Sequence, residues 1–118
     1  MVSQYGYATV NDLETFTSDD YSVVDAAYTD TIIESWITNS ERIINAYCGT
    51  TFTSTIPDAI KTATLMIASK FARNKMIEDK HVRDEQKSMK MIDDDIKEII
   101  KSYKDQYDDS QGIWVIKK

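Results

Sequence analysis

The chain contains few of the residues on which disulfide frameworks, cofactor sites and tight turns depend. Its 118 residues include one cysteine, one histidine, one proline and three glycines. The single cysteine, Cys48, excludes an internal disulfide and is typical of a reducing compartment. No apolar run approaches the roughly 20 residues that a membrane span needs, and the first ten residues do not resemble a secretion signal. We therefore expect one soluble domain, located in the cytosol or in something assembled there.

Basic residues are also in the minority, and the acidic excess is concentrated in the first half of the chain. The net charge is −6. Residues 1–56 hold eight acids and one base, Arg42, whereas residues 57–77 hold one acid and four bases. Nucleic-acid affinity comes largely from neutralised phosphates, and no continuous basic stripe exists here. The composition therefore argues against DNA or RNA binding, although it is compatible with a wall past which DNA slides.

The few reactive side chains form no pattern typical of catalysis or metal binding. His81 lies among charged residues and lacks the apolar surroundings of a general base, so we interpret it as a surface histidine. Cys48 has no basic neighbour that would activate it, which favours a small, semi-buried thiol. Asp93, Asp94 and Asp95 would diverge by about 100° each on a helix and could not chelate one ion. We expect no enzyme activity, no cofactor and no metal.

The strongest structural pattern is an apolar stretch from Pro57 to Ile77. Only Lys61 and Lys70 carry charge between residues 59 and 72. The apolar positions form two neighbouring stripes at helical spacing: Ile60, Thr64, Ile67 and Phe71 in one, and Leu65, Ala68, Ala72 and Met76 in the other. A helix that is apolar around most of its circumference lies inside a bundle. The sequence therefore predicts a central helix of about 30 Å, with Pro57 in its first turn, around which the other helices pack.

Two further helices are predicted before this central one. A short helix over Thr9–Phe16 has a variant capping box, formed by Thr9 and Asp12. Residues 17–29 are interpreted as a loop or irregular arm pinned by its aromatic side chains. A long helix follows from Asp30 to Tyr47 and stops at Gly49. Its predicted apolar face comprises Ile32, Ile33, Trp36, Ile37, Ile43, Ile44 and Tyr47, and the side chains expected to point away are Glu34, Asn39, Glu41 and Arg42.

The last helix is predicted to run from Met89 to Tyr107, after an exposed connection or frayed helix over residues 78–87. Asp93 and Lys97 are expected to form an i,i+4 pair on its surface. The complete pattern predicts an all-α fold: a small bundle of three long helices plus a short N-terminal helix. We assign residues 1–111 to this helical adaptor domain and residues 112–118 to an extended C-terminal tail.

The tail is the best candidate for a binding segment. Gly112 is followed by four apolar residues, Ile113–Ile116, and then by two lysines. An exposed strand of this kind is prone to aggregate, so it needs a partner. Either the tail packs back on its own domain, for example beside Tyr5–Val10, or it adds as a strand to another protein. The residues alone leave both alternatives open.

The order of these segments resembles the head–tail connector proteins of tailed bacteriophages, also called neck adaptor or head-completion proteins. The matching stretches are YATVNDLETF, IIESWITNSERIINAYCGTTF, IPDAIKTATLMIASKFARNKM and the lysine- and isoleucine-rich last helix, within residues 5–107. The chain departs from the usual pattern in its acidic first half, in its IWVIKK ending, and at Ser40 and Asn45, where alanine and aspartate are more usual.

The resemblance implies a structural subunit that assembles in the host cytoplasm as a ring, dodecameric in such proteins, in the virion neck under the portal. Such a ring extends the DNA channel, lets DNA pass without specific binding, contacts no membrane, and docks the next neck (stopper) or tail protein. It also implies a portal-binding role for the tail residues Gly112, Ile113, Trp114, Val115 and Ile116. The alternative is a cytosolic acidic helical interaction module, a regulator or inhibitor that masks a basic partner surface.

Overall fold

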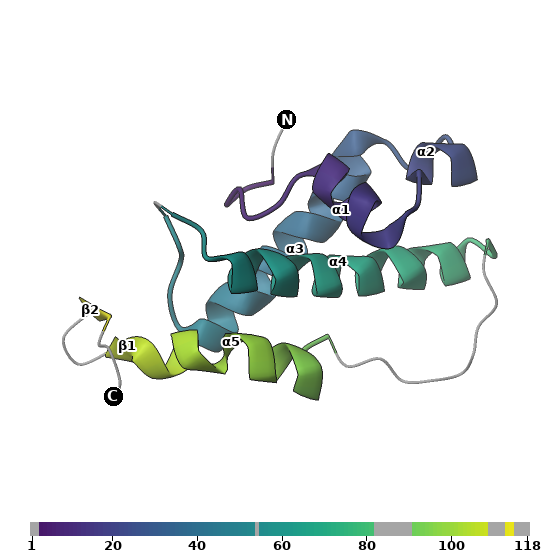
Figure 1. Cartoon of the computed structure of the whole chain (residues 1–118). Coiled ribbons are helices and arrows are strands. Elements are labelled where there is room, and N and C mark those ends of the chain that lie inside the picture. The colour runs from purple at the N-terminus through teal and green to yellow at the C-terminus, as the bar shows by residue number, and fades with distance from the viewer. Residues whose placement is uncertain (1–2, 54, 82–90, 109–112, 115–118) are drawn as a thin grey trace.

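A computed structural model of the chain contains five helices and one pair of very short strands within the described residues (Figure 1). It describes residues 3–53, 55–81, 91–108 and 113–114. The helices are α1 (Val10–Thr17), α2 (Tyr21–Val24), α3 (Asp30–Cys48), α4 (Asp58–Glu78) and α5 (Asp94–Gln106), and the strands are β1 (Tyr107–Asp108) and β2 (Ile113–Trp114). The predicted all-α class is confirmed, with α3, α4 and α5 as the three long helices.

The ends of the helices follow the predicted capping chemistry closely. Thr9 caps α1 in a complete capping box with Asp12, and Thr29 caps α3 through its hydroxyl. Gly49 ends α3 in the left-handed conformation, with φ 76°. Pro57 occupies the N-cap position of α4, one residue before the predicted first turn. These boundaries are set by local chemistry and could be predicted from sequence.

The central helix α4 supplies apolar side chains to two separate core clusters. In Figure 1, α3 crosses α4 obliquely, and α5 runs antiparallel to α4. The first cluster joins α1, α2 and the first half of α3 to α4; its buried members include Leu13, Tyr21, Tyr28, Trp36, Leu65, Ala68, Ala72 and Met76. The second joins the last half of α3 and α5 to α4; its buried members include Ile44, Cys48, Phe52, Ile60, Ile67, Ile96 and Ile100. The two predicted stripes therefore face two different sets of neighbours.

The segment before α3 is more ordered than the sequence indicated. The prediction of a loop over residues 17–29 is wrong at α2, which forms one helical turn. Its aromatic side chains do anchor it: Tyr21 and Tyr28 are buried and pack edge-on against Trp36, with ring centroids 5.4 and 5.7 Å away. Burial of these rings against α3 fixes a segment whose own periodicity is too short to indicate a helix.

Asp93 connects α5 to α4, in place of the predicted surface pair with Lys97. Its carboxylate lies 2.7 Å from the Lys70 amine of α4 and also accepts the Ile96 N–H at 2.9 Å. A residue just before a helix directs its side chain at the first turn's free N–H groups, so the aspartate cannot also reach along the helix surface. The hydrogen bond from Lys70, and next the Ile96 amide, lower the pKa of Asp93 below its ordinary value. The start of α5, predicted at Met89, lies at Asp94; Met89 itself is outside the described residues.

We expect Asp93→Asn to lower the free energy of unfolding at neutral pH by about 1 kcal/mol, because asparagine keeps the cap but loses the ion pair. A lowered folded-state pKa gives a stabilisation that is complete above the ordinary value of 3.8 and is lost as the pH falls through the folded pKa. Parent and variant should therefore converge in acid, below pH 3.8, in urea unfolding. Asp94→Asn, at an exposed position, is the control. A difference that persists unchanged in acid would contradict this role.

Candidate interaction surfaces

The buried carboxylate of Glu41 fastens the N-terminal segment to α3. It accepts the N–H groups of Tyr7 and Tyr5, at 2.7 and 3.1 Å, and the Ser3 hydroxyl at 2.5 Å. Gly6, with φ 70°, gives the backbone turn between the two amides. The prediction that Glu41 points away from the core is wrong, since its side chain is fully buried. A charged residue beside an apolar face can be buried when donors from elsewhere in the chain surround it.

The phenol of Tyr7 extends this attachment to the connection after α3. Its hydroxyl donates to the Asn45 side-chain oxygen and accepts the Phe52 N–H at 2.9 Å. Burial raises the pKa of Tyr7, so the hydroxyl stays protonated at neutral pH. The Phe52 ring in turn packs edge-on against Tyr103 of α5, with centroids 5.9 Å apart. The N-terminal segment, α3 and α5 therefore share one anchored edge.

A second acid on α3, Glu34, is also buried, with 6% of its surface exposed. It too was predicted to point away, and that prediction is wrong. Within the described residues its Oε1 has no hydrogen-bond partner. Asn39 and Arg42, the other two residues predicted to point away, are exposed as expected. Ile32, predicted to lie on the apolar face, is 39% exposed.

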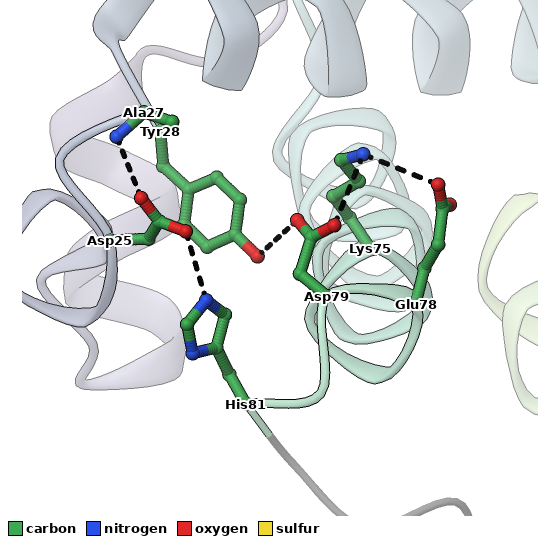
Figure 2. A network of polar contacts seen from close by, with 7 residues as sticks. All are labelled: Asp25, Ala27, Tyr28, Lys75, Glu78, Asp79 and His81. Carbon is green, nitrogen blue, oxygen red and sulfur yellow. Dashed lines mark hydrogen bonds and ion pairs between the residues drawn. The ribbon is translucent and has the colours of Figure 1, made fainter.

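A polar network fastens the connection between α2 and α3 to the end of α4, as Figure 2 shows. The Nε2 atom of His81 lies 2.9 Å from the Asp25 carboxylate, and the imidazole packs edge-on against the Tyr28 ring. The Tyr28 hydroxyl donates to Asp79 at 2.8 Å. Lys75 lies within 3.5 Å of Asp79. His81, interpreted from sequence as a surface histidine without a special role, is a member of this network.

The protonation states of the groups in this network favour a structural role for it. The Ala27 N–H, and next the hydrogen bond with His81, lower the pKa of Asp25. Burial, followed by the hydrogen bond to Asp79, raises the pKa of Tyr28 well above its ordinary value. Asp25 is therefore ionised and Tyr28 protonated at neutral pH, which is the state that their hydrogen bonds require. The polar groups of this network bind one another, so the network holds α2 in place.

Four large apolar side chains are exposed on α1, α2 and the first turn of α3, the elements that the first core cluster joins to α4. They are Phe16 at the end of α1, Val23 and Val24 on α2, and Ile32 in the first turn of α3, with 47%, 81%, 38% and 39% of their surfaces exposed. We call these four residues the apolar corner. They are the exposed large hydrophobic residues of the part of the chain that the structure describes.

The sequence signal for the apolar corner is weak but present. A one-turn helix that buries Tyr21 directs the side chain two positions later, Val23, away from that buried side. Val24, three positions after Tyr21, is less exposed than Val23 but is still 38% exposed. Both residues are β-branched and apolar, so a turn that exposes them leaves surface for a partner. The sequence does not predict this surface, because the pattern of residues 17–29 indicates a loop or irregular arm.

The C-terminal tail, the predicted binding segment, is partly described. Ile113 and Trp114 form β2, whose antiparallel partners are Asp108 and Tyr107 of β1. This strand therefore pairs with the end of its own domain and not with Tyr5–Val10. The other predicted portal-binding residues, Gly112, Val115 and Ile116, lie outside the described residues. The portal-binding role itself stays a prediction.

The remaining sequence candidates show no arrangement for chemistry in the described residues. Cys48 is buried in the second core cluster, deeper than the semi-buried position predicted. Asp94 and Asp95 are exposed, while Asp93 is engaged by Lys70. In the ranges described, no group of three or more histidine, cysteine or acidic side chains could hold a metal ion. None of the described helices is long and apolar enough to cross a membrane.

Comparison with known proteins gives one family. The family model described as phage gp6-like head-tail connector protein matches residues 23–104, which is more than half of the chain. The matched range begins in α2, includes all of α3 and α4, and ends within α5. No curated protein and no solved structure matches the chain significantly. The N-terminal segment, α1 and the tail lie outside the matched range.

Proposed function

Because the chain belongs to the phage gp6-like head-tail connector family, we propose that it is a ring-forming subunit of the virion neck, placed between the portal and the next neck or tail protein. The family is one of structural virion proteins, and its members act through contacts with other head and tail proteins. The single observation that carries the proposal is the match over residues 23–104, which falls on the α2–α5 bundle. The absence of a reactive constellation in the described residues agrees with such a role.

Ring assembly is supported by the distribution of surfaces on one subunit. Helix α2, which carries Val23 and Val24 of the apolar corner, lies at one end of the molecule, and the β1–β2 pair lies at the other (Figure 1). Two different surfaces on one chain are what a heterologous, head-to-tail contact requires, and such a contact closes into a ring when its rotation allows. We propose twelve copies, as the resemblance implies.

The charge of the chain supports a channel that DNA passes through without binding tightly to its wall. The net charge is −6, and the described lysines of α4 are engaged by acids: Lys61 with Asp12, Lys70 with Asp93, and Lys75 with Asp79. Lysines of α4 that are already paired with acids offer phosphates little to bind, so we expect DNA to pass this helix without a sequence-specific or tight contact. We propose that the ring extends the portal channel in this way.

We propose that the tail residues Gly112–Ile116 hold the ring to the portal. Within the described residues β2 pairs with β1 alone, on one edge, and the main-chain groups of its second edge could pair with another strand. We expect deletion of residues 112–118 to weaken binding to the purified cognate portal at least about tenfold, since Trp114 is the expected anchor. Lys117→Ala, which keeps the apolar residues, is the control. Undiminished binding by the deletion variant would contradict the assignment.

The decisive experiment for the function is the composition of purified particles. We expect the chain in isolated necks, in a ring between portal and tail when the particles are reconstructed by electron microscopy. The alternative, a cytosolic acidic regulator, predicts that the chain is absent from particles and that its gene lies away from portal and capsid genes. Absence from necks would therefore overturn the proposal.

A further inference from the structure

The apolar corner is a preformed surface, because its supports are buried or fastened. Tyr21 and Tyr28, which precede and follow Val23 and Val24 in sequence, are almost fully buried and pack against Trp36. The contact between Asp25 and His81 ties the connection behind α2 to the end of α4. A partner that binds here therefore meets apolar side chains held in place, and little ordering is needed on binding.

Exposed acids flank the corner and set the charge of its occupant. Asp19 and Asp20 precede α2, and Asp30 begins α3; all three are exposed. Within the described residues, no basic side chain pairs with any of them. The corner therefore suits an apolar segment that carries positive charge beside it, and it would repel a nucleic-acid backbone.

We propose that the apolar corner binds the C-terminal tail, residues 112–118, of a neighbouring copy of this chain. The tail carries four consecutive apolar residues, Ile113–Ile116, followed directly by Lys117 and Lys118, and it contains no acid. The apolar residues of the tail match the apolar side chains of the corner, and the two lysines of the tail match the acids that flank it. This inference rests on the proposed ring and names the contact between its subunits.

The geometry requires a neighbour's tail. The β1–β2 pair and α2 lie at opposite ends of a molecule that is 47 Å long (Figure 1). The four residues after Trp114, Val115–Lys118, span at most about 14 Å when fully extended. While the strand pair holds, the tail cannot reach the corner of its own chain. A contact that joins opposite ends of two copies is head-to-tail, as a ring needs.

The same tail can meet both a neighbour and the portal. Side chains project from the faces of a strand, whereas main-chain groups lie along its edges. Side chains on one face can fill the corner while the free edge of β2 pairs with another strand. The two contacts therefore use different groups of one segment.

The test is a titration of the full-length chain into a labelled peptide of residues 112–118, followed by fluorescence anisotropy. We expect saturable binding that Val23→Asp weakens at least about tenfold, because it places a carboxylate at the most exposed residue of the corner. Val23 is 81% exposed, so this variant should fold normally. The matched control is Ala46→Asp, at an exposed position on the other half of α3, which should bind like the parent.

A charge exchange tests the acidic flank independently. Asp19→Lys with Asp20→Lys should weaken binding of the native peptide and strengthen binding of a peptide carrying Lys117→Glu and Lys118→Glu. The inference is overturned if the native peptide does not bind, if Val23→Asp and Ala46→Asp bind it equally, or if the exchanged charges bring no rescue. Any of these results would leave the presence of the chain in virion necks unaffected, so failure of the contact is distinguishable from failure of the proposed function.

Discussion

Replacing Glu41 with alanine is expected to lower the free energy of unfolding by about 3 kcal/mol. The carboxylate is fully buried and accepts the N–H groups of Tyr5 and Tyr7 together with the Ser3 hydroxyl. Hydrogen bonds to a charged acceptor are about twice as strong as neutral ones, and removing the acceptor leaves the N–H groups of Tyr5 and Tyr7 without their partner, whereas the Ser3 hydroxyl keeps its contact with the Ala8 carbonyl. The N-terminal segment should then detach from α3.

Urea unfolding gives the loss of stability, and amide hydrogen exchange at Tyr7 locates it. The matched control is Glu34→Gln, which changes a second buried glutamate on the same helix. Its Oε1 has no described hydrogen-bond partner, so removing the charge should change stability by less than about 1 kcal/mol or stabilise the chain. If Glu41→Ala cost no more than Glu34→Gln, the carboxylate would not be the fastening we describe.

The contrast between these two acids shows where sequence reasoning succeeds and where it stops. Features encoded within one turn of helix were predicted correctly, such as the capping box of Thr9 and the glycine stop at Gly49. The buried state of Glu41 was not, because its donors lie 34 to 38 residues away in the chain. The predicted pair between Asp93 and Lys97 was wrong for the same reason, since the actual partner of Asp93, Lys70, is 23 residues away.

The two candidate surfaces, the tail and the apolar corner, also differ in whether the sequence predicts them. The tail is recognisable from composition, because four apolar residues after a glycine stand out in a polar context. The apolar corner depends on which side of α2 is buried, and that is decided by the packing of Tyr21 against Trp36. A single helical turn has too few residues for its periodicity to indicate an exposed side. Its exposure therefore became evident only in the folded chain.

The second large effect is expected at the central helix, where Ile67→Ala should lower the free energy of unfolding by about 3–4 kcal/mol. Ile67 is fully buried in the second core cluster, against α3 and α5. Truncation removes apolar contacts and leaves a cavity that rigid helices on both sides cannot fill. Ile32→Ala makes the same chemical change at a position that is 39% exposed and should cost about 0.5 kcal/mol.

This substitution also tests whether the two core clusters unfold together. Trp36 lies in the first cluster and Ile67 in the second, and Phe71 of α4 packs against both. Because α4 cannot lose one stripe of contacts and keep the helix that carries the other, we expect Trp36 fluorescence and far-ultraviolet circular dichroism to report the same lowered midpoint. A Trp114→Phe background leaves Trp36 as the only tryptophan. Separate midpoints would mean that α1, α2 and the first half of α3 unfold independently of the second core cluster. The fold of the apolar corner would then not depend on the packing of α4 against α5.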